Sequence, residues 1–370
     1  MTSREIVQRT IDFEDPPRLA FDYYAYGSRF TDIVTSYLDW EFVYDARTWI
    51  EGDREYCLDP YGNTWVRHVN DPGSKGLPCR GVLEKSWEGL ASFTMPKFSA
   101  AAGNDNVRRL FQSYPDLFKV GCLYNAAFSI LCCLRGFENL MQDVLAEPAA
   151  VREACGLIDR ELVDVVHSYA ACGADGLHIM EDLGTQTTTL IRPAVWEKLF
   201  APGYERLCRA AHEHGMRVIL HSCGAIRSLI PLLIDCGIDV LQFDQTHNYG
   251  SPEASGIERL AAEFHGRVAF FCPVDIQRTL VTGDRGQIED ETRRLVHCLG
   301  GRRGGFIAKS YGRGAGVYLD AINCAPEWND FAFECFRKHG EELFGAPIDL
   351  PRLDAERPRS PWAPAPGARR

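Results

Sequence analysis

The amino-acid sequence predicts a single (β/α)8 barrel of the α/β class. The chain has 370 residues, a length that one barrel with insertions can occupy as a single domain. Short runs of β-branched and aromatic residues alternate with helix-length amphipathic segments, as expected for βα units around a buried parallel sheet. Three of the helical segments end at a glycine just before the next run, where a helix C-cap leads into a strand.

Seven segments have the composition of buried strands. They are Leu19–Tyr23, Leu117–Cys122, Gly176–Met180, Arg217–Leu220, Asp239–Phe243, Val268–Phe271 and Gly305–Ala308. Amphipathic segments with helical spacing lie beside them at Ala149–Cys172, Glu197–His214 and Ile226–Cys236. The eighth strand is not placed. The region from Cys57 to Thr94 is one location for it, but the turn residues at 59–63 favour a β-hairpin insertion there.

The domain organisation is simple. Residues 1–345 are expected to form one barrel domain, and the Pro- and Arg-rich tail at 346–370 is expected to be disordered. The acidic surface also permits a homodimer, for which the sequence identifies no interface.

The overall composition excludes several classes of protein. A formal net charge of −11 argues against a nucleic-acid partner, because binding to phosphates needs a basic face. The N-terminal residues mix charges and lack an apolar signal segment, and the apolar stretch from Cys122 to Leu134 is too short to cross a bilayer. We therefore expect a cytoplasmic protein that does not bind membranes, with its 14 cysteines kept as reduced thiols.

Polar side chains follow the carboxyl ends of the predicted strands, which in a parallel barrel surround a shared active-site mouth. Those with candidate roles in catalysis or metal binding are Glu181, Asp182, His221, Cys223, Asp244 and Cys272. Those expected to bind substrate are Tyr23, Asn125, Gln242 and Lys309. For Lys309 the alternative is a side chain that extends into solvent.

The segment His221-Ser222-Cys223 is the strongest signal of a metal site. Alternate residues of an extended segment point the same way, so an imidazole and a thiolate can bind one zinc ion. Asp244 and Cys272, at the ends of the next two strands, are expected to complete the site. The alternative is that both cysteines are small buried residues and His221 is a hydrogen-bonded mouth histidine.

Glu181 and Asp182 form an adjacent pair of carboxylates at a strand end. Two carboxylates in a low-dielectric mouth raise each other's pKa, which suits acid and base catalysis. The alternative is that the pair caps the following helix or its turn.

Several short motifs together resemble the uroporphyrinogen decarboxylase superfamily. They are Leu134-Arg135-Gly136-Phe137-Glu138-Asn139, Gly173-Ala174-Asp175-Gly176, Glu181-Asp182-Leu183-Gly184, Ile191-Arg192-Pro193, Pro202, His214-Gly215, His221-Ser222-Cys223-Gly224, Leu229-Ile230-Pro231, Gly237-Ile238-Asp239-Val240 and Pro273-Val274-Asp275-Ile276-Gln277. The resemblance is good from residue 117 to residue 311 and absent in the tail. It implies a (β/α)8 barrel shared with heme-pathway decarboxylases, methylcobamide:coenzyme M methyltransferases and, more distantly, cobalamin-independent methionine synthase.

The branches of this superfamily differ in chemistry. Decarboxylases of the heme pathway carry an arginine-rich loop of the type RQAGRY for the substrate carboxylates, but residues 21–29 of this chain hold one arginine. The methyltransferase branch uses a zinc-bound His-x-Cys, which His221 and Cys223 match. Its third ligand is a cysteine after the last strand, where Gly312–Leu319 has none and Cys324 comes a few residues late. Cys272 or Asp244 is therefore the expected replacement.

The resemblance leads to one main hypothesis. It predicts a zinc-dependent methyltransferase that moves a methyl group between a small donor or a corrinoid, as substrate or as the cofactor of a partner protein, and an acceptor. Glu181 and Asp182 would orient the substrate or move protons. One alternative is a cofactor-free decarboxylase of tetrapyrrole biosynthesis, and another is a corrinoid- or tetrapyrrole-binding protein without catalysis.

Overall fold

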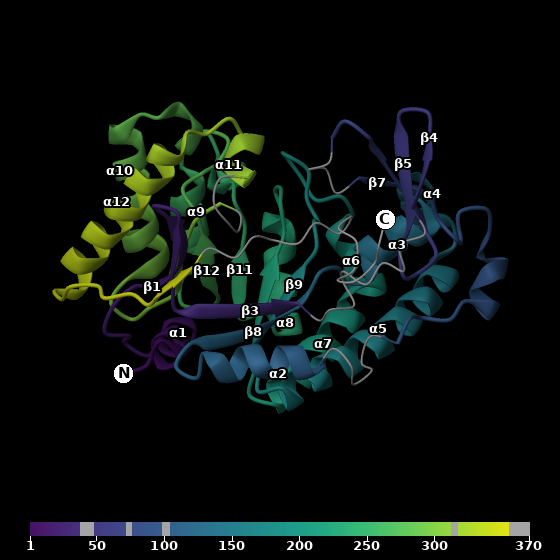
Figure 1. Ribbon diagram of the computed structural model, residues 1–370, viewed down its shortest axis with the longest axis horizontal. Helices are drawn as coiled ribbons and strands as arrows, with labels where there is room; N and C mark the ends of the chain where they lie inside the picture. Colours follow the sequence, from purple (N-terminus) through teal and green to yellow (C-terminus); the bar gives the residue numbers. More distant parts are fainter. Residues whose placement is uncertain (38–47, 72–75, 98–103, 312–316, 355–370) are drawn as a thin grey trace.

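A ten-stranded curled sheet forms the centre of the molecule, with helices packed outside it (Figure 1). The computed structural model describes residues 1–37, 48–71, 76–97, 104–311 and 317–354. The order of the strands is β14-β2-β1-β13-β12-β11-β10-β9-β8-β3. From β1 to β3 in this order, each strand pairs in parallel with the next. The fold is therefore α/β, with the parallel core that the sequence predicted.

The strands of the parallel run, in chain order, are β1 Ala20–Ala25, β3 Ile33–Tyr37, β8 Phe118–Leu123, β9 Gly176–Met180, β10 Arg217–His221, β11 Val240–Gln242, β12 Ala269–Cys272 and β13 Phe306–Lys309. Each of the seven predicted strands overlaps one of them. The strand that the sequence left unplaced is β3, which lies outside the region from Cys57 to Thr94. It follows β1 and the short antiparallel strand β2 (Ser28–Thr31) after a single intervening residue, Asp32.

The helices, in chain order, are α1 Ser3–Asp12, α2 Asn104–Ser113, α3 Ala127–Arg135, α4 Phe137–Ala146, α5 Pro148–Ala171, α6 Pro193–Leu199, α7 Ala201–Glu213, α8 Ile230–Cys236, α9 Gly256–Phe264, α10 Arg285–Arg294 with a π-helical extension Leu295–Gly300, α11 Val317–Ala321 and α12 Pro326–Phe344. Short 3-10 helices occur at Trp87–Ser92, Arg227–Leu229, Thr246–Tyr249 and Leu280–Thr282. Among the described residues, none of the helices combines the length and the apolar character needed to cross a membrane.

The two ends of the parallel run approach each other at Asp32. The backbone N–H of Asp32 donates to Phe21 O of β1 at 2.8 Å, and Phe118 N–H of β8 donates to Asp32 O at 2.9 Å. The carboxylate of Asp32 is fully buried and accepts two hydrogen bonds from the guanidinium of Arg18, at 2.8 and 2.6 Å. Because the bidentate pair satisfies the buried charge, the backbone is held where the sheet curls back on itself.

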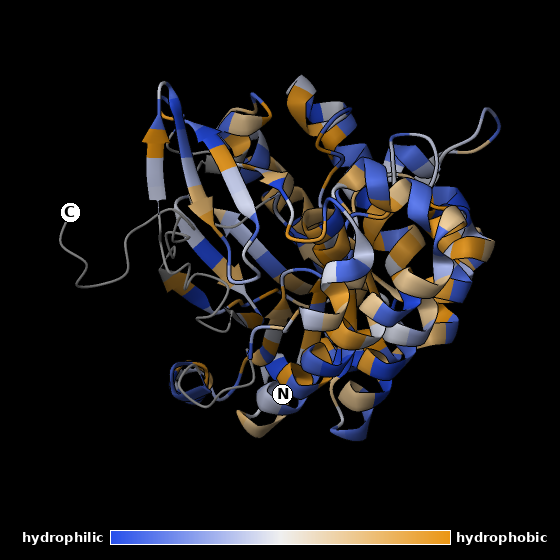
Figure 2. Cartoon of the chain, turned by 90° about the vertical axis from the view of Figure 1, so that its right-hand side faces the viewer, coloured by the Kyte–Doolittle hydropathy of each residue, from blue (hydrophilic) through white to orange (hydrophobic). Residues whose placement is uncertain are grey.

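Alternate residues of the strands face the inside of the curled sheet, and the others face the helices. The inner core includes Ile33, Phe118 and Ile219, and it packs against Ile6 and Val7 of α1, which covers the amino ends of the strands. A larger core lies between the outer face of the sheet and the helices. Both faces are apolar, as expected for a parallel sheet that is covered on each side. Figure 2 shows this as orange central strands and helices of mixed colour.

A separate antiparallel sheet lies near α3 and α4 (Figure 1). It consists of β4 Thr48–Glu51, β5 Arg54–Leu58, β6 Thr64–His68 and β7 Leu77–Arg80. Strands β5 and β6 pair across residues 59–63, where the Asp59 carboxylate accepts hydrogen bonds from the N–H groups of Tyr61 and Asn63. This separate sheet thus has more strands than the single hairpin that the sequence predicted.

The predicted disordered tail begins with ordered residues. Strand β14 (Arg352–Asp354) pairs antiparallel with β2 and extends the curled sheet at its edge. The remainder of the predicted tail, 355–370, lies outside the described residues.

Candidate metal site

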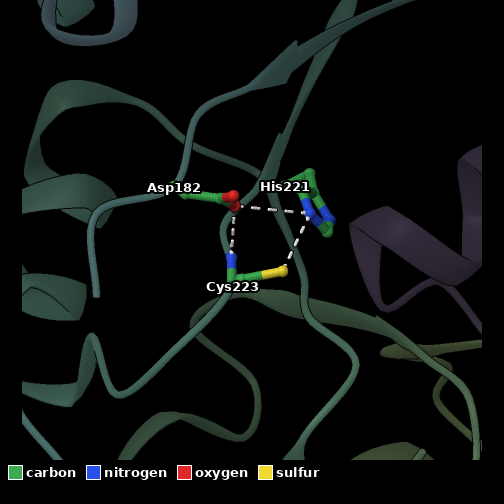
Figure 3. A group of neighbouring side chains, drawn as sticks. All are labelled: Asp182, His221 and Cys223. Atoms are coloured by element: carbon green, nitrogen blue, oxygen red, sulfur yellow. Dashed lines mark hydrogen bonds and ion pairs between the residues drawn. The ribbon is translucent and has the colours of Figure 1, made fainter. Parts of the chain in front are cut away.

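Three side chains that can bind a metal meet at the carboxyl ends of β9 and β10 (Figure 3). They are Asp182, His221 and Cys223, each of which offers a ligand atom within 4.8 Å of the other two. The Cys223 Sγ atom lies 3.5 Å from Nε2 of His221, and Asp182 Oδ1 lies 3.7 Å from the same nitrogen. The cluster is open on one side, since the Asp182 side chain is 63% exposed and that of His221 is 14% exposed.

The local backbone explains why the imidazole and the thiol converge. His221 is the last residue of β10, and it has the same side-chain direction as Ile219, which lies in the inner core. Cys223 follows two residues later and so points the same way. The Cys223 N–H group donates to Asp182 Oδ1 at 2.9 Å, which fixes the carboxylate beside the thiol.

A close contact between two glycines holds the loop after β9 against the loop after β10. A Cβ atom at Gly224 would lie 2.4 Å from the carbonyl carbon of Gly184, and Gly224 has φ of +84°. Only glycine fits this approach and this backbone conformation without strain. Hydrogen bonds flank the contact, from Leu183 N–H to Ser222 Oγ at 2.9 Å and from Ala225 N–H to Thr185 O at 2.7 Å. The loops that carry Asp182 and Cys223 are thereby fixed to each other.

Nearby carboxylates affect the protonation of the Cys223 sulfur. Burial raises the pKa of the Cys223 thiol, and the negative charges of Asp182 and Asp244 raise it further. Without a cation the sulfur is therefore a thiol, because the nearby carboxylates oppose a second negative charge. A divalent ion among these groups would compensate the carboxylate and favour the thiolate.

A second polar layer lies beneath the cluster on the inner face. His221 Nδ1 lies 2.8 Å from Oε1 of Gln242, which is its partner on β11 in the sheet register. His178 of β9 also hydrogen-bonds to the Gln242 side chain and is almost fully buried. Burial lowers the pKa of His178 to about 3, and the neighbouring His221 and the charge of Lys309 lower it further. His178 is therefore a neutral imidazole.

Asp244 and Lys309 are paired with each other instead of serving the predicted cluster. Lys309 Nζ lies 2.6 Å from Asp244 Oδ1, with side chains that are 10% and 5% exposed. Burial alone raises the pKa of Asp244, but the charges of Lys309 and His221 outweigh this effect and lower it. The structure does not bring Asp244, a predicted metal ligand, into the described ligand group. Lys309 was predicted to bind substrate, and its ammonium group is held in this buried ion pair.

Cys272 also lies outside the cluster. It shares its side-chain direction with Phe270, which packs in the outer core, whereas Phe271 faces inward. Cys272 is fully buried, and this burial raises the pKa of its thiol to about 12. The prediction of a ligand is therefore corrected, and the buried small residue that was the alternative describes this cysteine. Cys324, the later cysteine, is likewise buried, with Sγ 3.9 Å from Leu280 O.

The two carboxylates of the predicted pair, Glu181 and Asp182, lie in different environments. Glu181 is buried on the outer side, where it accepts a hydrogen bond from Ser129 N–H in the first turn of α3 at 2.8 Å and another from the Tyr204 hydroxyl. Burial raises the pKa of Glu181 to about 7. It caps a helix N-terminus, as the alternative reading of this pair had it, although the helix is α3 rather than the one that follows. Asp182 alone faces the mouth, and it joins the ligand group instead of acting with Glu181.

Two predicted substrate contacts remain. Tyr23 points outward, with its hydroxyl donating to Asn329 O at 3.1 Å and its ring against Phe333, so its predicted contact with substrate is corrected. Asn125 lies half-buried in the loop between β8 and α3. The contribution of Asp182 to the ligand group was missed by the sequence argument. The signal that could have found it is its place directly after the strand that neighbours His221.

A family model described as uroporphyrinogen decarboxylase (URO-D) matches residues 101–321, which include all three residues of the cluster. A methyltransferase from Methanosarcina mazei has a similar structure, with a TM-score of 0.57 and 12% sequence identity over 91% of this chain and 99% of that chain. At this identity the similarity concerns the fold.

Two further solved structures are less similar. A D-psicose 3-epimerase has a TM-score of 0.40 and 11% identity over 66% of this chain and 85% of that chain. A D-allulose 3-epimerase from Methylomonas sp. has a TM-score of 0.39 and 15% identity over 64% of this chain and 82% of that chain. A search of curated protein sequences finds no match.

Proposed function

The chain belongs to the uroporphyrinogen decarboxylase family, and we propose that it is a zinc-dependent methyltransferase of that family. It would transfer a methyl group between a small donor or a corrinoid and an acceptor. The curled parallel sheet is then the family's (β/α)8 barrel, with the reaction at the carboxyl ends of its strands. The observation that carries the proposal is the meeting of Asp182, His221 and Cys223.

The distances within the cluster fit a tetrahedral zinc ion. Typical Zn–N and Zn–S bonds place a nitrogen and a sulfur ligand about 3.5 Å apart, and a nitrogen and an oxygen ligand about 3.4 Å apart. The separations in this structure are 3.5 Å from Cys223 Sγ to His221 Nε2 and 3.7 Å from Asp182 Oδ1 to the same nitrogen. The donor set of one imidazole, one thiolate and one carboxylate is also one that zinc accepts.

Each residue would have a defined task. His221 and Cys223 would hold the ion on the inner side of the mouth, and Asp182 would hold it on the solvent side. Catalytic zinc sites usually have three protein ligands and one exchangeable position. When bound, zinc would act as a Lewis acid that keeps an acceptor thiol in its thiolate form at neutral pH. The exposed Asp182 leaves room for the acceptor to approach.

The charges of the inner face disfavour the decarboxylase alternative. A tetrapyrrole substrate with many carboxylates requires cationic groups that are free to bind them. Among the described residues, Arg29 donates to Asp22 Oδ1 at 2.8 Å and Lys309 pairs with Asp244 at 2.6 Å. These buried pairs leave the local charge close to neutral, which suits a smaller substrate with few charges.

Two measurements test the proposal. Elemental analysis of the purified full-length chain should find about one zinc per chain, and His221→Ala and Cys223→Ser should each lose most of it. The zinc-loaded protein should also demethylate methylcobalamin in the presence of a small thiol, seen as a change in visible absorbance. Zinc far below one equivalent in the wild-type protein would overturn the proposal, and so would turnover of uroporphyrinogen by the metal-stripped protein.

A further inference from the structure

The side chain of Gln242 lies between two histidines from neighbouring strands. Its Oε1 atom is 2.8 Å from Nδ1 of His221, and its amide also hydrogen-bonds to His178. All three side chains face the inner side of the sheet, and Gln242 is 7% exposed. Hydrogen bonds thus connect His178 to Gln242 and Gln242 to His221. The other ring nitrogen of His221, Nε2, lies near Cys223 and Asp182.

We propose that Gln242 is a positioning residue that selects the tautomer of His221 with its proton on Nδ1 and its Nε2 bare. This inference deepens the proposed function and rests on it for the role of the metal. A carbonyl oxygen cannot donate a hydrogen bond, so the short contact with Oε1 requires the ring proton on Nδ1. The lone pair of Nε2 then points toward Cys223 and Asp182, where a ligand nitrogen is needed.

The opposite orientation of the amide would block the site. If Gln242 were turned, its NH2 group would donate to Nδ1 of His221 and place the ring proton on Nε2. A protonated Nε2 cannot bind a metal.

His178 is the end of this chain of hydrogen bonds. Its Nε2 atom is buried without a hydrogen-bond partner among the described residues, and the side chain is 3% exposed. Leaving this nitrogen unsatisfied costs free energy. The other contact of His178 is a hydrogen bond with Gln242, the side chain that lies beside Nδ1 of His221. Gln242 is the hydrogen-bond partner of His221. Removing a partner of this kind from a metal-binding histidine typically lowers metal affinity about 10- to 100-fold.

The tautomer can be measured directly in the metal-free protein. With 15N-labelled histidine, long-range proton–nitrogen NMR spectra distinguish a proton on Nδ1 from one on Nε2. Wild-type His221 is expected with its proton on Nδ1. Gln242→Met should lose this preference, and Gln242→Glu should keep it because a carboxylate also accepts from Nδ1. Retention of the wild-type tautomer in Gln242→Met would overturn the inference.

Titration with Co2+, followed by visible absorbance, gives an independent readout. Gln242→Met should bind Co2+ about 10- to 100-fold more weakly, and Gln242→Glu should remain within about threefold of wild type. Equal affinity of Gln242→Met and wild type, or a loss of more than tenfold in Gln242→Glu, contradicts the inference. The Gln242→Glu arm also decides the matter if Gln242→Met does not fold.

A matched control separates this role from a general effect of removing an amide. Gln245→Met makes the same change at another buried glutamine, whose Oε1 has no hydrogen-bond partner among the described residues. This variant should keep both the tautomer and the Co2+ affinity. If wild-type protein binds no Co2+, the proposed function fails, while the NMR comparison still judges the role of Gln242.

Discussion

Cys223 Sγ lies 3.5 Å from Nε2 of His221, although the two residues were related in the sequence only by their spacing of two. This distance is close to the separation of two ligands on one zinc ion, about 3.5 Å. The thiol and the imidazole are therefore spaced as two ligands of one cation would be. The predictions that follow test which neighbouring residues take part in this arrangement.

The two cysteines of the original hypothesis should behave differently. Cys223→Ser should lose most of the bound zinc, whereas Cys272→Ala should retain it, because Cys272 faces the outer core. Cys272→Ala should instead lower the free energy of unfolding by about 1 kcal/mol through lost burial. Elemental analysis and denaturant unfolding check both results. Loss of zinc in Cys272→Ala would show that the side chain reaches the site after all.

Substitution of the two aspartates near the mouth should also have different effects on metal binding and stability. Asp182→Asn should weaken Co2+ binding at least tenfold while leaving stability nearly unchanged, because the side chain is largely exposed. Asp244→Asn should retain the ligand group but leave the buried Lys309 without its partner. Breaking a buried pair in this way costs about 3–5 kcal/mol. Metal titration and urea unfolding of both variants are the measurements, and a strong metal effect with Asp244→Asn alone would reverse the assignment.

The contact between Gly184 and Gly224 should be sensitive to one added methyl group. Gly224→Ala places a Cβ 2.4 Å from the Gly184 backbone in a left-handed conformation, so the loops that carry Asp182 and Cys223 must separate. We expect a loss of more than about 2 kcal/mol in unfolding free energy, together with weaker Co2+ binding.

Gly215→Ala provides the control for this variant. Gly215 has φ of +73°, but a Cβ there meets nothing within 4 Å. The unfolding free energy of this variant should therefore fall by only about 1 kcal/mol, the cost of alanine in a left-handed backbone conformation, and its Co2+ affinity should not change. Equal losses of unfolding free energy and of Co2+ affinity in the two variants would mean that the contact between the loops does not position the ligands.

Glu181 should make the stability of the protein depend on pH. Burial raises the pKa of Glu181 to about 7, above the ordinary value of 4.5. The folded state therefore binds this proton more tightly than the unfolded state does. The resulting stabilisation is fully present below pH 4.5 and is lost as the pH rises through about 7. The loss should be on the order of 3 kcal/mol.

Comparison with Glu181→Gln isolates this effect. The glutamine variant cannot titrate, so its unfolding free energy should fall less than that of wild type between pH 4.5 and 8. Unfolding should be measured with a chelator present, because bound metal would add its own pH dependence. Glu205→Gln, at an exposed position on α7, should follow wild type. Parallel curves for Glu181→Gln and wild type would contradict the prediction.

The sequence predicted most of the parallel sheet because strands buried on both faces are nearly continuous apolar runs. Strand β3 escaped this reasoning because its apolar residues Ile33 and Val34 are followed by the polar Thr35 and Ser36, and because it follows β2 after one residue. The pattern of such a segment does not distinguish a new strand from the continuation of a hairpin. The backbone contacts of Asp32 with β1 and β8 decide its place.

The sequence by itself determined the pairing of His221 with Cys223, since residues two apart in an extended segment always share a face. It could not determine the third ligand, because that choice depends on which face each neighbouring strand presents. A shift of one residue along a strand reverses the direction of a side chain. Tyr23, Glu181 and Cys272 are each on the outward face, while Asp182 lies on the side of the mouth. Only the tertiary structure, through strand register and the packing of the helices, fixes that direction.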